Sequence, residues 1–331
     1  MYVYRPVMRS KAGEAAALKH LASSSKARTF PICVVMESPP ASFASTVGPA
    51  WAGLPLALDG RLTTTLTGSA TNFSDMFKAL GKAGVEVSPS VSVRADTTYL
   101  KAVNTALGKY SDSLTLKAKL NDLGVIAAWC SNQGWNTKDI DLVITLGDIA
   151  GYESEMFHPF VANAIQTNLG KTPEWRTVTL VASSAPKNYS GLPSGRTNVP
   201  RREWTLWQAV APALPFELNF GDTGQVHPSM EEPPGFAMAK ATVSVRYTVD
   251  ECWIILKGRP TSGRNGKPMA DQYRQHAQTL SRDPQFDALP NCWADDRIKE
   301  IASGKTRSGN RTTWVSIGMN RHISLVTDRL P

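Results

Sequence analysis

Short apolar runs alternate along the chain with longer stretches in which apolar residues recur every three or four positions. Phe30–Met36 is apolar at nearly every position, which is typical of a strand buried on both faces. Ala12–Leu21 places Ala15, Leu18 and Leu21 at helical spacing, and therefore predicts an amphipathic helix.

Eight short segments, either continuously apolar or alternating between apolar and polar residues, are expected to be strands, and helical stretches intervene between most of them. The predicted strands are Tyr2–Met8, Phe30–Met36, Leu54–Leu58, Val85–Val93, Leu114–Leu120, Ile140–Leu146, Thr177–Ala182 and Phe216–Phe220. Strict alternation of this kind favours parallel strands joined by crossovers. Eight such units predict an α/β fold, a closed (β/α)₈ TIM-barrel-like structure. The alternative is an open doubly wound sheet, whose usual Gly-rich first turn is not present at Lys11-Ala12-Gly13-Glu14.

The chain after the eighth strand follows a different pattern. We expect residues 1–225 to form the barrel and residues 226–331 to form an appended β-hairpin with helices packed on the barrel. Asp250-Glu251 is the predicted turn of the hairpin. The predicted strands of the hairpin are Ala241–Val249 and Cys252–Lys257, and the predicted helices are Met269–Arg282, Ala294–Ile301 and Thr313–Val326. Within the barrel portion, Lys187–Pro200 is rich in Gly, Ser, Pro and Asn and is expected to be a surface loop.

Composition narrows the function classes. The chain has 331 residues, 42% hydrophobic and 19% charged, which are ordinary globular values. Its net charge of +8 favours acidic partners and makes nucleic acid a candidate partner. The four cysteines form no Cys-x-x-Cys pair, so we expect reduced thiols rather than a zinc site. Because no signal peptide and no apolar run of ~20 residues is present, we expect a cytoplasmic protein with no membrane partner.

Candidate catalytic residues follow from the strand ends, because a TIM barrel carries its active site at the carboxyl ends of its strands. The strand-end candidates are Glu37, Asp59, Lys119, Asp148, Ser183 and Asp222. Four of these are acids, and Mg²⁺ prefers carboxylate oxygens, while a lysine offsets phosphate charge. Glu37, Asp59, Asp148 and Asp222 are therefore candidate magnesium ligands. The alternative is that each acid caps the following helix or fixes a turn.

Candidate binding residues are mostly arginines. Arg5, Arg9, Arg201 and Arg202 are expected to line the barrel mouth and hold an anion, or, for the last two, to lie in a solvated loop. Trp204 is expected to pack in the core, with base stacking as the alternative.

Two further interpretations concern the junction after the eighth strand. His322 lies in a predicted helix and is expected to be buried rather than a general base. Asp222 and Arg246 are expected to meet in one polar cluster, because a partly buried arginine needs an anionic partner. This cluster would either lock the hairpin onto the barrel or form half of a ligand site.

Three sequence blocks, together with the opening Tyr4-Arg5-Pro6-Val7 and the Lys11/Glu14 pair, resemble the beta family, named for the beta gene of phage gop–beta–cin clusters. The blocks are Pro200–Trp207 with Phe220–Gly224 and His227-Pro228; Val245–Thr248 with Trp253 and Lys257–Arg259; and Gly309–Trp314 with Gly318, Asn320, His322 and Leu325-Val326. The resemblance implies a barrel-like fold and a setting of phages, prophages and mobile defence or toxin-control islands. It implies no particular reaction. This chain has Thr223 where the family commonly has an aromatic residue, and Arg321-His322 where it often has two histidines.

Two functions follow as hypotheses. The first is a cytosolic accessory protein of a phage or defence module, in toxin control or anti-phage action, that binds a partner protein or nucleic acid through its basic loops. These loops are Arg259–Lys267 and Gly304–Arg311. The alternative is a metal-dependent TIM-barrel hydrolase that acts on a phosphodiester.

Overall fold

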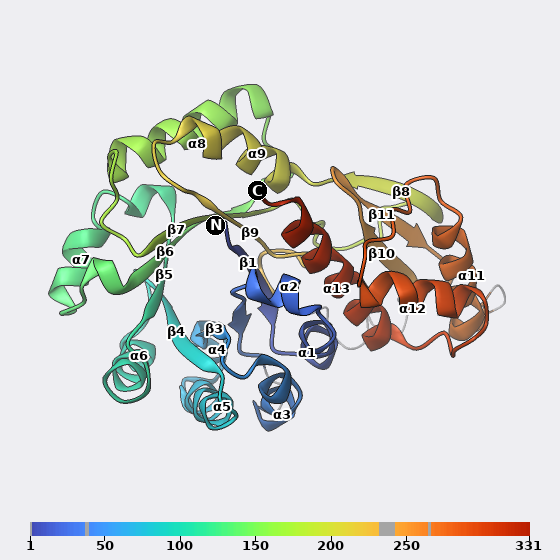
Figure 1. Cartoon of the computed structure of the whole chain (residues 1–331), viewed down its shortest axis with the longest axis horizontal. Coiled ribbons are helices and arrows are strands. Elements are labelled where there is room, and N and C mark those ends of the chain that lie inside the picture. The colour runs from blue at the N-terminus through green and yellow to red at the C-terminus, as the bar shows by residue number, and fades with distance from the viewer. Residues whose placement is uncertain (1, 37–39, 232–241, 264–265) are drawn as a thin grey trace.

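Eight parallel strands close into a barrel (Figure 1). The computed structural model describes residues 2–36, 40–231, 242–263 and 266–331. The strands follow one another around the barrel, and the last closes it by pairing with both the first and the seventh. They are β1 (Tyr4–Arg9), β2 (Ile32–Val34), β3 (Pro55–Asp59), β4 (Glu86–Ser92), β5 (Leu114–Ala118), β6 (Ile140–Asp148), β7 (Thr177–Ser183) and β9 (Asn219–Asp222). The predicted TIM-barrel-like fold is confirmed, and the open doubly wound sheet is wrong.

Helices connect the barrel strands and surround them (Figure 1). The short stretch predicted as the third strand forms β3, which pairs in parallel with both β2 and β4. Asp96 caps the helix after β4 by accepting the Tyr99 N–H at 2.8 Å. The helices are α1 (Ala12–Lys19), α2 (Ser23–Ala27), α3 (Pro40–Trp51), α4 (Arg61–Thr67), α5 (Thr71–Lys82), α6 (Thr97–Tyr110), α7 (Ile126–Asn132), α8 (Ser154–Leu169) and α9 (Arg202–Val210), with short 3₁₀ turns η1 (Leu120–Asp122), η2 (Thr137–Asp139) and η3 (Ala211–Ala213).

The main core lies between the barrel strands and these helices. Leu116, Leu142, Leu180 and Phe220 point outward from their strands into this core and are almost fully buried. Each buried side chain of this size contributes about 1.5–3 kcal/mol. The residues that alternate with them must therefore face the inside of the barrel.

The inside of the barrel is apolar on one side and polar on the other. A separate apolar cluster includes Val7, Ile32, Val34, Ala57, Val143 and Val181. On β4, by contrast, Ser88 and Ser90 alternate with the outward-packed Val87 and Val91. A TIM-barrel interior is usually filled by bulky branched residues, so this polar side is unusual.

A three-stranded antiparallel sheet lies beside the barrel. The predicted hairpin is confirmed as β10 (Ser244–Thr248) and β11 (Cys252–Lys257). The expectation of a surface loop over Lys187–Pro200 is wrong in its second half, because Gly195–Pro200 forms β8 and pairs with β11. This strand alternates exposed and half-buried residues without a run of apolar ones, so it carries no hydrophobic signal. Its position at the edge of the sheet explains that composition.

Among the described residues, three helices complete the part of the molecule beside the barrel: α11 (Met269–Ser281), α12 (Trp293–Ala302) and α13 (Arg311–Arg329). They pack with β10 and β11 around a second core, in which Tyr273 stacks on Trp314 with ring centroids 5.3 Å apart. The central part of α13 contributes Met319 and Ile323 to the barrel core. In Figure 1 this helix lies between the barrel and α12. Among the residues that the structure describes, no helix has the length and apolar character needed to cross a membrane.

Candidate functional site

An ion pair lies at the carboxyl ends of the barrel strands. Asp59, the last residue of β3, pairs with Lys117 of β5. The Asp59 carboxylate also accepts the Arg61 N–H at 2.9 Å. The Asp59 side chain is 3% exposed and the Lys117 side chain is 16% exposed. Lys117 is therefore a cation that retains some contact with solvent at the end of the barrel where TIM barrels carry their active sites.

Lys119, the lysine predicted for this position, lies elsewhere. It follows the end of β5, is exposed, and has its backbone N–H bonded to the carboxylate of Asp122 at 3.0 Å. Lys117 reaches Asp59 because it alternates with the outward-facing Leu116 and therefore points inward. The alternation of inward-facing and outward-facing residues along β5 is the sequence signal that identifies Lys117.

The predicted magnesium ligands do not gather in one place among the described residues. Asp148 lies 3.5 Å from the His227 ring nitrogen Nε2, and its side chain is about half exposed. Asp59 is paired with Lys117, and Asp222 with His322. Over the described ranges, no group of three or more His, Cys, Asp or Glu residues is arranged to hold a metal ion. Glu37 lies outside the described residues.

Asp222 points outward from the barrel, toward α13. It lies on the same face of β9 as Phe220, which is in the outer core, while Gly221 faces the interior. Its Oδ1 accepts the Tyr4 hydroxyl at 2.6 Å and the Gly224 N–H at 2.8 Å. Its Oδ2 lies 2.9 Å from Nε2 of His322. The Asp222 carboxylate therefore stabilises the junction between the barrel and α13 and does not face the barrel mouth.

The junction continues into the three-stranded sheet as a directional chain of hydrogen bonds. The Asp222 carboxylate can only accept, so His322 donates to it from Nε2. Nδ1 then accepts from the Thr248 hydroxyl at 3.2 Å. Thr248 in turn accepts from the Gln225 side-chain amide at 3.4 Å. All four of these side chains are buried, so the barrel, sheet and α13 meet in one buried polar contact.

The acid–base properties of the junction follow from its burial. Burial lowers the pKa of His322, and the nearby Asp222 offsets this only in part, so the ring is neutral near pH 7. Burial raises the pKa of Asp222, but His322, Arg201 and the Tyr4 hydroxyl outweigh it and hold that pKa below its ordinary value. An ionised carboxylate beside a neutral imidazole fits the hydrogen-bond directions.

Arg201 and Glu203 extend the same buried network beside α9. Arg201 Nε lies 3.6 Å from Glu203 Oε1, and both side chains are at most 1% exposed. The other carboxylate oxygen accepts the Ser184 hydroxyl at 2.5 Å. Burial raises the pKa of Glu203 to about 7, although Arg201 opposes it. The expectation of a solvated loop is therefore wrong for Arg201.

Arg246 does not pair with Asp222, and the prediction of that ion pair is wrong. The guanidinium of Arg246 lies over the Tyr189 ring, 4.2 Å from its centroid, and donates to the Gln225 carbonyl at 2.9 Å. The Asp222 carboxylate already accepts from donors in β1, in the backbone after β9 and in α13. A ring face and a carbonyl oxygen satisfy the half-buried arginine in place of a carboxylate.

The remaining predicted binding residues are dispersed. Arg5 is buried in the barrel, 3.0 Å from Asp141, and donates to Thr115 at 2.8 Å. Arg202 is exposed and donates to the Tyr152 carbonyl at 2.9 Å. Trp204 is 4% exposed and packs edge-on against the barrel core, so it is not placed for base stacking. These residues do not line one mouth.

An exposed apolar stripe follows β6. Tyr152, Met156 and Phe160 recur every four residues, and their exposed fractions are 52%, 79% and 58%. Met156 and Phe160 therefore lie on one face of α8. Tyr152 stacks on the half-buried Phe157, with ring centroids 4.4 Å apart. We call these three exposed side chains the α8 stripe. The sequence pattern of α8 does not separate them from core positions, because apolar residues lie on more than one of its faces.

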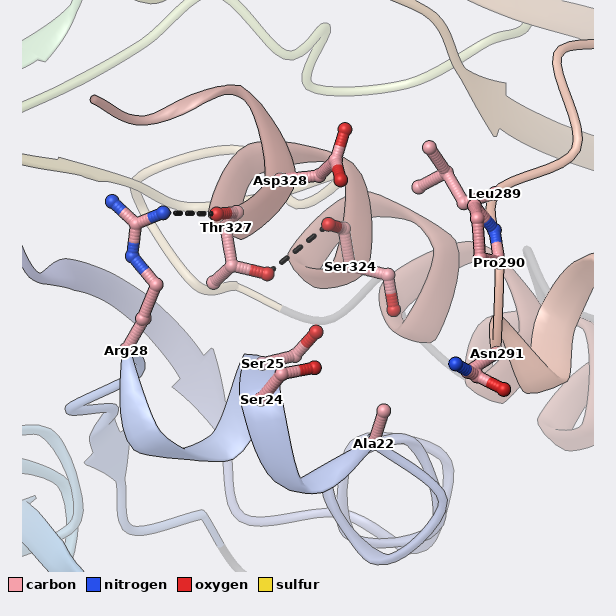
Figure 2. A pocket seen from close by; sticks show the side chains of 10 residues that line it. All are labelled: Ala22, Ser24, Ser25, Arg28, Leu289, Pro290, Asn291, Ser324, Thr327 and Asp328. Carbon is pink, nitrogen blue, oxygen red and sulfur yellow. Dashed lines mark hydrogen bonds between the residues drawn. The ribbon is translucent and has the colours of Figure 1, made fainter.

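Two hollows flank α13. The smaller, about 230 Å³, separates α2 from the end of α13 (Figure 2). Ser24 and Ser25 face it from α2, while Arg28 donates to the Thr327 carbonyl at 2.9 Å. Arg28 also donates to the Pro331 carbonyl at 2.6 Å. Hydrogen bonds from the Arg28 guanidinium to backbone oxygens therefore join the two sides of this hollow. The larger, about 640 Å³, lies between the turn of the hairpin and α13.

Comparison with known proteins identifies a family. A sequence model described as Beta protein matches residues 4–328. The chain belongs to the Beta protein family. A comparison with curated proteins finds no match.

Two solved structures resemble this Beta family chain only weakly. One is described as a fructose-1,6-biphosphate aldolase from Coccidioides immitis, with 9% identity, a TM-score of 0.40, and coverage of 99% of this chain and 90% of that one. The other is described as 3-keto-D-glucoside 4-epimerase from E. coli, with 11% identity, a TM-score of 0.34, and coverage of 71% and 95%. Neither activity transfers to this chain at this level of similarity.

Some of the residues that carry the Beta family resemblance meet at the junction. Arg201 and Glu203 come from the first block, Thr248 from the second and His322 from the third, and all join the network around Asp222. The family pattern therefore includes the contact that joins the barrel to the sheet and α13.

Proposed function

We propose that this Beta family protein is a cytosolic accessory protein of a phage, prophage or defence module, and that it acts by binding a partner protein through the α8 stripe. The observation that carries the proposal is the exposure of Tyr152, Met156 and Phe160. Clustered large apolar side chains that remain exposed are typical of interaction surfaces. Toxin control and anti-phage action are the settings that the family resemblance supplies.

Charge around the stripe favours a protein partner over nucleic acid. Glu153 and Glu155 are exposed beside Tyr152 and Met156, and Asp148 is half exposed at the end of β6. These acids outnumber Arg202, the exposed cation that donates to the Tyr152 carbonyl. Acidic side chains repel phosphates, so nucleic acid is a poor occupant of this surface despite the net charge of +8. The partner that fits presents apolar side chains surrounded by lysines and arginines.

The alternative, a metal-dependent hydrolase of phosphodiesters, has less support. Its metal site requires several carboxylates within coordination distance of one ion. Asp59, Asp148 and Asp222 each lie against a different basic side chain.

The experiment measures binding of the purified chain to the proteins encoded beside its gene, by biolayer interferometry at 50 and 500 mM salt. We expect one of them to bind and the double variant Met156→Ser/Phe160→Ser to weaken that affinity at least tenfold. Leu66→Ser is the matched control, because Leu66 is 65% exposed but lies on α4. Its affinity should stay within twofold of the native chain.

Three outcomes contradict the proposal. Equal loss of affinity in the double variant and the Leu66 control removes the role of the stripe. Binding of DNA or RNA that falls steeply with salt, with no protein bound, favours nucleic acid instead. Hydrolysis of a phosphodiester that requires added Mg²⁺ or Mn²⁺ favours the hydrolase.

A further inference from the structure

The end of β6 turns a carboxylate toward the barrel mouth. Ile144 points outward into the main core, and strict alternation would send Asp148, four residues later, the same way. A register shift between Thr145 and Gly147 reverses this, because beyond it Asp148 lies opposite Ser183 of β7. Ser183 alternates with outward-facing residues, so both side chains are on the inner side of the wall. The bulge therefore brings Asp148 to the mouth.

His227 and Ser229 lie beside this carboxylate, on the loop that follows β9. The Ser229 hydroxyl is 3.0 Å from His227 Nδ1, and the Ser229 backbone N–H donates to the same nitrogen at 3.2 Å. In the neutral ring Nδ1 is therefore unprotonated, and the proton is on Nε2, which faces Asp148 Oδ2 at 3.5 Å. Hydroxyl, unprotonated ring nitrogen, ring N–H and carboxylate follow one another in the order that an activated serine requires.

Solvent reaches this group of side chains, in contrast to the buried contact between His322 and Asp222. The His227 side chain is 19% exposed and the Asp148 side chain 48%, and Ser229 is partly exposed. The Ser229 hydroxyl accepts the Glu231 N–H at 3.4 Å, which leaves its own hydrogen for His227. All of these residues follow barrel strands at their carboxyl ends, where TIM barrels carry their active sites. A small molecule can therefore approach the hydroxyl.

Charge and exposure limit the substrates that fit. Asp148 and Glu231 are acidic, and Lys187 balances only Glu231, at 2.9 Å. The surroundings are therefore negative, which disfavours an anionic acyl group. The contact between His227 and Asp148 is long and half exposed, so it stabilises a protonated ring only modestly. An alcohol is an easier leaving group than an amine under these conditions, which favours uncharged esters over amides.

We propose that Ser229 is the nucleophile of a hydrolase of small, uncharged carboxylic esters, with His227 as its general base and Asp148 as a positioning residue. Ser229 Oγ bonds to the carbonyl carbon, and its proton moves to His227 Nδ1. The bond from that carbon to the alcohol oxygen breaks, and the alcohol leaves with the proton. Water then gives a proton to Nδ1 and attacks the acyl carbon. The bond to Oγ breaks, Ser229 recovers the proton, and the carboxylic acid leaves.

A fluorophosphonate probe tests the nucleophile without knowledge of the ester, because an activated serine displaces its fluoride and keeps the phosphonyl group. Intact-protein mass spectrometry and peptide mapping of the full chain should show one adduct, at Ser229. Ser229→Ala should abolish it, and His227→Gln should slow it at least about 100-fold. Ser190→Ala is the matched control, because the exposed Ser190 hydroxyl contacts Asn188 and no imidazole, and its labelling rate should be unchanged.

The role of Asp148 needs a separate measurement. Asp148→Asn should lower the maximal labelling rate about tenfold without changing the probe concentration that gives half of it, and Asp148→Glu should recover part of the loss. With p-nitrophenyl acetate, an acetyl adduct should form on Ser229 before the slower release of acetate. Labelling needs no partner protein, so its outcome is independent of the α8 stripe. No adduct on the native chain, adducts spread equally over other serines, or unchanged labelling of His227→Gln would each overturn the proposal.

Discussion

His322 Nε2 lies 2.9 Å from Asp222 Oδ2, and this contact joins the last barrel strand to the last described helix. The carboxylate holds three donors at once, from β1, from the backbone after β9 and from α13. It is 1% exposed. Three elements distant in sequence are therefore fixed by one side chain.

Removing that carboxylate should destabilise the fold. Asp222→Ala leaves the Tyr4 hydroxyl, the Gly224 N–H and His322 without an acceptor, and we expect a loss of about 3–5 kcal/mol in the free energy of unfolding. Urea denaturation followed by circular dichroism measures it. Asp148→Ala is the control, since its half-exposed pair with His227 should contribute less than about 1 kcal/mol. Similar losses in both variants would contradict a special role for Asp222.

The raised pKa of Glu203 predicts a pH dependence of stability. Its folded-state pKa of about 7 lies above the unfolded value near ~4.3, so the folded state binds the proton more tightly. The resulting stabilisation is complete below the unfolded pKa and is lost as pH rises toward 7.

Between pH 5 and 8 the native chain should therefore lose up to about 3 kcal/mol more than Glu203→Gln, because each unit of pKa shift corresponds to ~1.4 kcal/mol. Urea midpoints of both chains across this range give the comparison. Parallel curves would show that Glu203 does not titrate there.

Strand alternation in the sequence predicts that Asp222 lies outside the barrel, whereas its position at a strand end had suggested the barrel mouth. Phe220 and Asp222 are two residues apart, and the apolar side of β9 faces the helices, so the same alternation places the carboxylate outside the barrel. The position of a residue at a strand end fixes where it lies along the barrel axis, but not whether its side chain points inward or outward. Lys117 follows the same logic: its alternation with Leu114 and Leu116 marks it as inward-facing.

Other features had no sequence signal. The eight barrel strands were predictable because strands buried on one or both faces carry alternating or continuous apolar residues. This reasoning does not apply to β8, because an edge strand is held by backbone hydrogen bonds to β11 and needs no apolar face. The partners of Arg246 and Asp222 come from β1, α13 and the loops that hold Tyr189 and Gly224-Gln225, and no local spacing encodes how the fold brings them together.

The Asp59–Lys117 pair should show strong coupling. Lys117→Met leaves a buried carboxylate without its cation, and we expect a loss of about 3 kcal/mol. Adding Asp59→Asn to that variant removes the second charge and should recover more than about 1 kcal/mol. A double-mutant cycle from urea denaturation measures the coupling energy. Additive effects of the two substitutions would mean that the pair contributes nothing as a pair.

Gly221 should tolerate no side chain. A Cβ there would lie 2.6 Å from Cγ2 of Val181 and 2.7 Å from the carbonyl oxygen of Arg5, both inside the barrel wall. Gly221→Ala should therefore cost about 1–3 kcal/mol or more. Gly108→Ala, on an exposed part of α6 with no atom within 4 Å, should instead stabilise the protein by up to about 1 kcal/mol. Thermal melts of the two variants should shift in opposite directions.

The place of α13 in the chain has a consequence for biosynthesis. A ribosome finishes all eight barrel strands before it reaches residue 311, so a nascent barrel holds Asp222 and Tyr4 without the helix that covers them. His322, Met319 and Ile323 arrive only with that helix. We therefore expect the barrel to become resistant to proteases after α13 leaves the exit tunnel, and translation products halted earlier to be degraded.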